Sequence, residues 1–297
     1  MDLTLIPYLL MGTAISFAVL NNYILHRFSN RGLNNTGDVF LFNAFTSIGW
    51  SLVLLVWAAI SKDLRIDGRT LCYGLIYGMI LFTFLLFKTF SLAEGPVALT
   101  TLIGSFGFII ASGYSVLFLG ETVTAAQIAG VLGLILSLYF CVNVKSSEMK
   151  LSFKWAILCF VYFVAGGAVG ILYREFGTSP VAGNVNGMMF SAALTAAVLF
   201  ALGGICLNRI GHAPFPQIPK SAWKYVAAGA LTGCVYIRIN ISLSNVIPNV
   251  IFFPISNGAL VMLSALVGWK FFGEKLSKTQ IMGLVMGLCS MIVIGCF

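Results

Sequence analysis

Ten polar side chains inside long apolar stretches of the sequence are candidates for binding a solute, because an unpaired amide, hydroxyl or guanidinium group there costs free energy. They are Asn22, Asn43, Ser105, Tyr162, Asn186, Tyr236, Arg238, Asn240, Ser256 and Asn257. Groups of these types bind a solute by hydrogen bonds and carry no obvious catalytic chemistry. As a set they suit a cavity for an uncharged or zwitterionic polar solute. For each single residue, pairing with a neighbouring helix is the alternative.

Arg238 is the most informative member of the set, because an arginine at the centre of a membrane helix costs roughly 2.5–3.5 kcal/mol. If its helix spans Ala222–Leu243, Arg238 lies about 7–8 Å from the midpoint near Gly233, at 1.5 Å per residue. Such a residue is kept for an anion, a backbone carbonyl or water. We expect Arg238 to meet an acidic group of the substrate; snorkelling to the headgroups is the alternative.

Pro254 lies just before Ser256 and Asn257 in another apolar stretch. A proline cannot donate to the helix ladder, so a carbonyl is left free within the span. Transporters expose backbone groups to solutes at such broken helices. We therefore include this stretch in the expected binding site, with a kink needed only for curvature as the alternative.

Several kinds of chemistry lack the residues that they need. No Asp or Glu lies in the middle of an apolar stretch, so a membrane-buried carboxylate relay is not expected. His26 and His212 have no partner at metal-ligand spacing, and the seven cysteines show no paired spacing. Phosphate-loop, nucleophile-elbow and His-Glu metal motifs are missing. We predict no catalytic residue, no metal site and no cofactor.

Membrane helices must position the polar residues, since 59% of the chain is apolar and only 9% is charged. In soluble domains roughly 45–50% of the residues are apolar and roughly 25% are charged. The sequence predicts an all-α polytopic membrane protein with ten transmembrane helices of about 20 residues, enough to cross a hydrocarbon core of about 30 Å. The predicted helices are Leu5–His26, Asp38–Ile60, Arg69–Ser91, Val97–Phe118, Thr124–Asn143, Phe153–Tyr173, Asn184–Cys206, Ala222–Leu243, Asn249–Phe271 and Lys278–Phe297.

Pairs of glycines one helical turn apart occur in four of these helices, among them Gly166 and Gly170 in the sixth and Gly283 and Gly287 in the tenth. Gly74 and Gly78 lie in the third helix, and Gly229 and Gly233 in the eighth. Small residues at this spacing let helix backbones approach closely in lipid. We expect them to pack helices within the chain rather than between chains.

One short hairpin sequence occurs twice in the chain. FLGETVTAAQIAGVLGLILS begins at Phe118 and FFGEKLSKTQIMGLVMGLCS at Phe271, so matching residues are 153 positions apart (271 − 118). These markers divide the chain into two five-helix repeats, 1–147 and 148–297, which together form one transport domain. An odd number of crossings inverts the second repeat, and inverted repeats recur in secondary transporters. A turn that a duplication preserved for its structure alone is the alternative.

The glutamate of each hairpin precedes an apolar helix. Glu121 and Glu274 can interact with the positive end of that helix and with its unpaired N–H groups. We expect each to cap the helix that follows it in the chain.

The chain resembles the EamA-type drug/metabolite transporter superfamily over essentially its whole length. The residues that carry the resemblance are Gly120-Glu121 and Gly273-Glu274 followed by Gln127/Gly130 and Gln280/Gly283, with Gly95-Pro96-Val97 and Pro254-Ile255-Ser256-Asn257-Gly258. The resemblance implies a substrate cavity between the two repeats and alternating access. It is specific for the fold and weak for the substrate, because the hairpin markers are structural. The first helix lacks the glutamate of the small multidrug resistance branch, which disfavours exchange of protons for cationic drugs.

The expected function is that of a secondary transporter for a small polar metabolite, with amino acids or related zwitterions favoured. Without an ATP-binding motif, the energy must come from a gradient. The abundant aromatic residues leave a multidrug or aromatic-compound exporter open, and a membrane-embedded enzyme or sensor on the same fold is an alternative of another class. The expected partners are a small-molecule substrate and the lipid bilayer, with no nucleic acid. Monomer and homodimer both stay open.

Charge distribution predicts the orientation in the cell (inner) membrane. Of the 17 lysines and arginines, 12 fall on one face of the predicted arrangement, Lys270 and Lys278 among them, and five on the face that holds both termini. Cationic loops stay cytoplasmic, so both termini should lie outside. A C-terminal reporter that works only in the cytoplasm should be silent. An active reporter would reverse the orientation and leave the fold intact.

Overall fold

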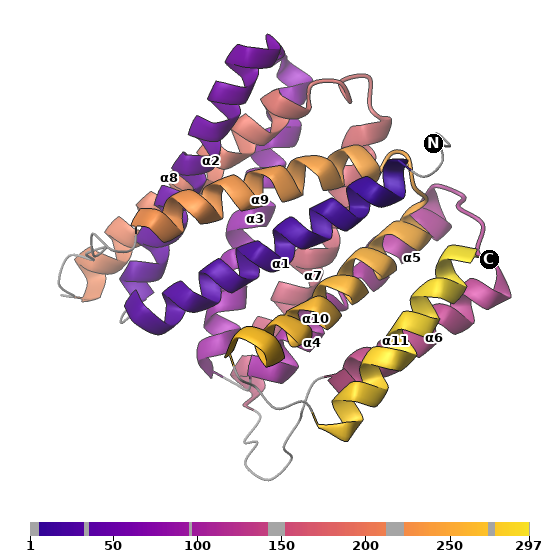
Figure 1. The fold of residues 1–297 in the computed structure, drawn as a ribbon. Helices are drawn as coiled ribbons and strands as arrows, with labels where there is room; N and C mark the ends of the chain where they lie inside the picture. Colours follow the sequence, from indigo (N-terminus) through magenta and orange to yellow (C-terminus); the bar gives the residue numbers. More distant parts are fainter. Residues whose placement is uncertain are drawn as a thin grey trace. The chain divides into compact units, whose positions relative to one another are not determined.

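The structure, a computed structural model, describes residues 6–32, 36–94, 97–141, 152–211, 223–272 and 277–296. Every regular element in these ranges is a helix (Figure 1). The helices are α1 (Ile6–Gly32), α2 (Thr36–Ser61), α3 (Gly68–Glu94), α4 (Val97–Ser105), α5 (Phe108–Phe118), α6 (Ala125–Cys141), α7 (Phe153–Thr178), α8 (Val185–Gly211), α9 (Trp223–Leu243), α10 (Asn249–Phe272) and α11 (Lys278–Cys296).

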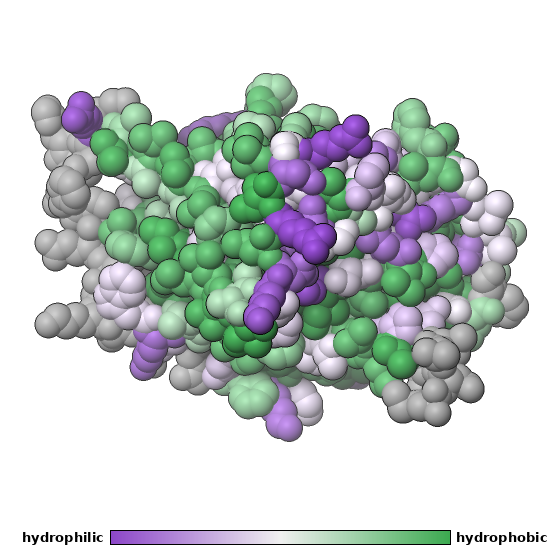
Figure 2. Space-filling view, turned by 90° about the horizontal axis from the view of Figure 1, so that it is seen from above, coloured by the Kyte–Doolittle hydropathy of each residue, from purple (hydrophilic) through white to green (hydrophobic). Residues whose placement is uncertain are grey.

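Seven helices in the described ranges are long and apolar enough to cross a membrane, namely α2, α3 and α7–α11. Large apolar side chains are exposed along them, for example Val56, Phe160 and Ile292. Apolar side chains likewise make up much of the face drawn in Figure 2. The predicted all-helical protein with membrane-type helices is confirmed.

The prediction of a single helix over Val97–Phe118 is wrong. The chain forms α4 and α5 there, joined by a tight turn in which Gly107 N–H bonds to Gly104 O at 3.2 Å and Ile109 N–H bonds to Phe106 O at 2.9 Å. Bonds three residues apart narrow the helix locally. Both glycines of the turn also lie against α7: the Tyr162 ring passes over Gly104, and a Cβ on Gly107 would lie 3.0 Å from the backbone nitrogen of Gly167.

The chain divides into two compact units, which we describe separately. Unit 1 comprises Met1–Phe82 and Glu175–Ser242, and unit 2 comprises Thr83–Arg174 and Leu243–Phe297. Unit 1 therefore holds α1, α2, the first part of α3, α8 and nearly all of α9. Unit 2 holds the rest of α3, then α4, α5, α6, most of α7, α10 and α11.

In unit 2, α6 and α11 pack along each other through reciprocal contacts. A Cβ on Gly283, early in α11, would lie 2.9 Å from the carbonyl oxygen of Ser137, late in α6. A Cβ on Gly130, early in α6, would lie 3.2 Å from the carbonyl oxygen of Ser290, late in α11. The start of each helix thus meets the end of the other, so the two run antiparallel.

Both helices of this pair begin with the same capping box. Thr124 N–H donates to Gln127 Oε1 at 3.0 Å, and Gln127 N–H donates to Thr124 Oγ1 at 3.1 Å. Ser277 and Gln280 repeat the exchange at 2.9 and 3.2 Å. The glutamine that recurs in both hairpins therefore accepts the N–H of the residue that precedes its helix, and the hydroxyl of that residue accepts the N–H of the glutamine.

In unit 1, α2 and α8 also run antiparallel. Phe40 near the start of α2 packs on Gly203 near the end of α8, whereas Asn186 at the start of α8 donates to the carbonyl oxygen of Asp63, just beyond α2. On α3, Gly74 and Gly78 lie directly against α8. The prediction that this glycine pair packs helices within the chain is confirmed.

Replacing Gly283 by alanine should destabilise unit 2. The new methyl group would lie 2.8 and 2.9 Å from backbone atoms of α6, which cannot move aside as a flexible side chain can. We expect Gly283→Ala to lower the free energy of unfolding by about 1–3 kcal/mol, the usual cost of overpacking. Denaturant titration in detergent measures the change.

Gly113→Ala is the matched control, because a Cβ at this position of α5 meets nothing within 4 Å. Since alanine favours a helix interior over glycine, this variant should be neutral or slightly more stable. Equal losses in the two variants would contradict the packing described for α6 and α11.

Candidate functional site

Unit 1 contains a polar cluster around Arg238, which we call the Arg238 cluster and which comprises Trp57, Asp63, Asn186 and Arg238. Arg238 Nε on α9 donates to Asn186 Oδ1 at 3.1 Å, and Asn186 Nδ2 donates to Asp63 O at 3.0 Å. Asn186 is only 1% exposed, so both of its hydrogen bonds are protected from competition. The buried amide ties the arginine to the loop that follows α2.

The guanidinium of Arg238 also lies over the ring of Trp57, with Cζ 5.4 Å from the ring centroid. The ring face attracts a cation and holds the plane of the guanidinium. Among the described residues, the structure gives no hydrogen-bond partner to the two terminal nitrogens of Arg238 and no carboxylate in ion-pair contact with it. The cluster therefore orients a positively charged fork whose outer N–H groups are available.

Hydrogen bonds at the start of α3 hold the loop between α2 and α3, which carries Asp63. Thr70 N–H donates to Asp67 Oδ1 at 2.7 Å, and this hydrogen bond lowers the pKa of Asp67 below its usual value. Asn184 Nδ2 donates to Thr70 Oγ1 at 3.1 Å, which joins the start of α3 to the residue just before α8. These bonds hold the ends of the loop that carries Asp63.

The other predicted site residues of unit 1 do not gather around Arg238. Asn43 Nδ2 donates to Val39 O of its own helix at 2.9 Å, while Asn22 is half-buried on α1. Tyr236 and Asn240 lie on α9, two residues to either side of Arg238, and so face away from it. Among the predicted residues of this unit, Arg238 contacts Asn186, and the side chains of Tyr236 and Asn240 form a hydrogen bond with each other.

Asn21, the neighbour of Asn22 in unit 1, was not among the predicted site residues. Asn21 Nδ2 donates to Gly229 O and to Thr232 Oγ1, both at 2.9 Å, and so links α1 to α9. The cost of an unpaired amide in an apolar stretch applies equally to both asparagines, so the sequence alone does not distinguish the one that links α1 to α9.

Two of the four predicted site residues of unit 2 form hydrogen bonds within their own helix or turn. Ser105 Oγ donates to Leu102 O at 2.7 Å beside the α4–α5 turn, and Asn257 Nδ2 donates to Phe253 O at 2.9 Å beside Pro254. Tyr162 is buried against Gly104 and against Phe84, and the ring centroids of Tyr162 and Phe84 are 4.9 Å apart. Ser256 Oγ is buried without a hydrogen-bond partner among the described residues.

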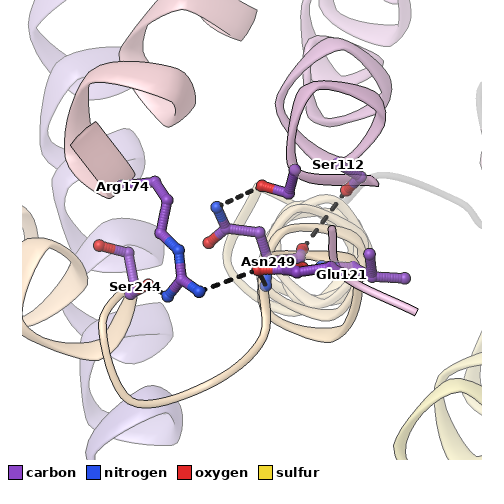
Figure 3. A network of polar contacts seen from close by, with 7 residues as sticks. Ser112, Glu121, Arg174, Ser244 and Asn249 are labelled. Atoms are coloured by element: carbon purple, nitrogen blue, oxygen red, sulfur yellow. Dashed lines mark hydrogen bonds and ion pairs between the residues drawn. The ribbon is translucent and has the colours of Figure 1, made fainter. Parts of the chain in front are cut away.

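Unit 2 contains a second polar cluster that the sequence analysis did not predict. Glu121 follows α5, and its carboxylate accepts the N–H groups of Asn249 and Val250 at 3.2 and 3.1 Å (Figure 3). These are the first two N–H groups of α10, so the carboxylate sits at the positive end of that helix. The expectation that Glu121 caps the following helix α6 is wrong, because Thr124 and Gln127 fill that role. Glu274 lies outside the described residues.

Arg174 near the end of α7 completes this Glu121 cluster. Its Nη2 lies 3.2 Å from Glu121 Oε1 and its Nη1 donates to Ser244 O at 2.8 Å. The two charged side chains are 19% and 10% exposed, so the ion pair is largely desolvated. The cluster joins α5, α7 and α10 by charge-assisted hydrogen bonds, which are stronger than neutral ones.

Asn249 supplies the remaining bonds of the Glu121 cluster. Its Nδ2 donates to Ser115 Oγ at 2.8 Å, and its carbonyl oxygen accepts from Ser112 Oγ at 3.3 Å. Its Oδ1 is buried without a partner among the described residues. The arrangement neutralises its own charges, and it is suited to fastening helix ends rather than to acid–base chemistry.

Among the described residues, no group of three or more His, Cys, Asp or Glu side chains is placed to hold a metal ion.

Comparison with known proteins adds evidence on the fold. No model of a known protein family matches the chain, and no curated protein matches it. One protein of known crystal structure matches 97% of this chain over 95% of its own, with a TM-score of 0.74 and 18% sequence identity. At this identity the likeness shows a shared fold and leaves the function open.

Glu121→Ala should destabilise the protein more than the loss of an ordinary cap, which costs about 0.5–2 kcal/mol. The substitution leaves the largely buried Arg174 without its partner and uncovers two N–H groups of α10. We expect the free energy of unfolding to fall by about 3–5 kcal/mol, the range for breaking a buried pair from one side. Denaturant titration in detergent is the measurement.

Glu94→Ala provides the control, since Glu94 pairs with Lys154 on the exposed surface, where an ion pair contributes about 0–1 kcal/mol. The double variant Glu121→Gln/Arg174→Gln should recover part of the loss. If Glu121→Ala lowered the free energy of unfolding no more than Glu94→Ala does, the proposed contribution of the Glu121 cluster to stability would be refuted.

Proposed function

We propose that the protein is a secondary transporter for a small polar metabolite that bears a carboxylate, with amino acids and related zwitterions favoured. It works by alternating access between two inverted five-helix repeats, 1–147 and 148–297, with both termini outside the cell membrane. The observation that carries the proposal is the antiparallel packing of equivalent helices from the two halves of the sequence.

Two such pairs support the inverted repeat. Gly130 and Gly283 occupy equivalent places in the two hairpin sequences, as do Ser137 and Ser290, and their contacts are exchanged between α6 and α11. An exchange of this kind is what a two-fold axis produces. The pair α2 and α8, which come second in their repeats, is antiparallel as well. Inverted-topology repeats about an axis in the membrane plane are a recurrent plan of secondary transporters.

A ten-helix chain needs three crossings beyond the seven long apolar helices. We assign them to α1, to α4 and α5 together, and to α6. A helix broken within the span is common in transporters, where the free backbone groups meet a solute or a cavity. The break between α4 and α5 and the proline in α10 lie in the same unit, and both fit this plan.

The Arg238 cluster supports a carboxylate as part of the substrate. Asn186 and Trp57 fix the guanidinium, so it presents its outer N–H groups without losing further freedom on binding. A guanidinium fork matches the two oxygens of a carboxylate. Snorkelling to the headgroups accounts less well for a side chain whose Nε is already bonded to a buried amide.

Transport by purified protein in proteoliposomes tests the proposal with a panel of labelled amino acids, other carboxylates and neutral polar solutes. Arg238→Gln should abolish uptake of the carboxylate-bearing solute and still give monodisperse protein. Arg238→Lys should rescue it only in part, because an ammonium group cannot replace the fork. Asn186→Leu should weaken uptake, since it removes the group that orients the guanidinium.

Arg209→Gln is the control, because Arg209 is an exposed cation at the end of α8 and should have no effect on uptake. Wild-type uptake by Arg238→Gln would remove this residue from the site and argue against a carboxylate-bearing substrate. Absence of uptake for every solute by the wild-type protein would argue against transport itself.

A further inference from the structure

An apolar groove of about 830 Å³ runs between α10 and α11 in unit 2. Its lining includes Leu263, Leu266 and Trp269 of α10 and Ile281, Val285 and Leu288 of α11. All six side chains are exposed, between 39% and 58%, although both helices are apolar enough to cross a membrane. Something apolar must therefore cover this groove in the bilayer.

Two lysines mark one end of the groove. Lys270 follows Leu266 by four residues on α10, and Lys278 precedes Ile281 by three residues on α11. Residues three or four apart share a helix face, so each lysine extends a stripe that lines the groove. Both lysines are exposed and lie where α10 ends and α11 begins. The far end of the groove, near Ala259 and Met291, has no charged lining residue.

We propose that this groove binds an anionic phospholipid, with its phosphate at Lys270 and Lys278 and one acyl chain along the groove. The distance fits: the ten residues from Lys278 to Leu288 rise about 15 Å, and one leaflet is about half of a 30 Å hydrocarbon core. Trp269 beside Lys270 is of the type that sits at headgroup level. Basic residues between membrane helices are a known way to hold anionic headgroups.

A second copy of the chain is a less suitable occupant. A two-fold axis along the membrane normal keeps both copies at the same depth, so Lys270 and Lys278 would face the same two lysines of the other copy. Juxtaposed like charges disfavour such an interface. A single lipid with a negative headgroup instead neutralises the lysines and fills the apolar space.

Quenching of Trp269 fluorescence by brominated lipid tests the proposal in the intact, reconstituted protein. The vesicles contain phosphatidylcholine with a small, fixed fraction of either brominated phosphatidylglycerol or brominated phosphatidylcholine. Subtracting the signal of Trp269→Phe isolates the Trp269 contribution from that of the other tryptophans. We expect stronger quenching by the anionic lipid, with each lysine contributing about fivefold to the preference.

Lys270→Gln/Lys278→Gln should remove the preference, and Val285→Phe should lower quenching by both lipids because it fills the groove without changing its charge. Lys224→Gln, at an exposed lysine on α9 outside the groove, should leave the preference unchanged. Equal quenching by the two lipids in the wild-type protein overturns the proposal, as does a preference that survives the double lysine variant. Protection of Trp269 from both lipids overturns it in favour of a second copy.

Discussion

A hydrocarbon solvent forms no hydrogen bonds, and this constraint governs nearly every polar contact in the structure. Within a span, a group that water would satisfy must find a partner in the protein. Asn43, Ser105 and Asn257 turn back to carbonyl groups of their own helices. Asn21 and Asn186 reach other elements instead and thereby fix how helices meet. The same chemical group therefore closes a helix on itself in one place and builds tertiary structure in another.

The constraint is most severe at helix ends that the protein buries. The first N–H groups of α10 have no carbonyl partners in the helix, and Glu121 supplies them from a different part of the chain. A carboxylate there is desolvated in turn, and Arg174 compensates it. One unsatisfied helix end thus accounts for the buried ion pair, and the carboxylate of that pair joins the end of α5 to the start of α10, more than a hundred residues later in the sequence.

Local features of the fold could be predicted from the sequence, and partners across elements could not. The apolar runs predicted the helices, and the spacing of Gly74 and Gly78 predicted a packing face. Both features depend on residues that are one or two helical turns apart. The α4–α5 break escaped prediction because it depends on Tyr162 and the glycines of α7, which only the folded chain brings to Gly104 and Gly107. Glu121 was expected to cap α6, the next helix in the chain, but it caps α10, which tertiary structure brings to it.

For the candidate site, residue type was more informative than position. Arg238 and Asn186 were both predicted from the cost of burying polar groups, but their mutual contact spans 52 positions and leaves no periodic signal. Three other predicted residues, Asn43, Ser105 and Asn257, satisfy carbonyl groups of their own helices, which polarity alone cannot distinguish from solute binding. Arg174 was not among the predicted site residues, because nothing in the neighbouring sequence marks it as buried.

The two arginines differ in what balances their charge, and that difference bears on which of them can meet a solute. Arg174 is paired with the carboxylate of Glu121, so its cluster is neutral and would gain little from an additional anion. Arg238 is bonded to a neutral amide and lies on an aromatic face, neither of which cancels its charge. A carboxylate that reaches Arg238 would meet an oriented guanidinium that no carboxylate of the described residues compensates, whereas at Arg174 it would have to displace an existing partner. The electrostatics thus favour the Arg238 cluster for recognition and the Glu121 cluster for structure.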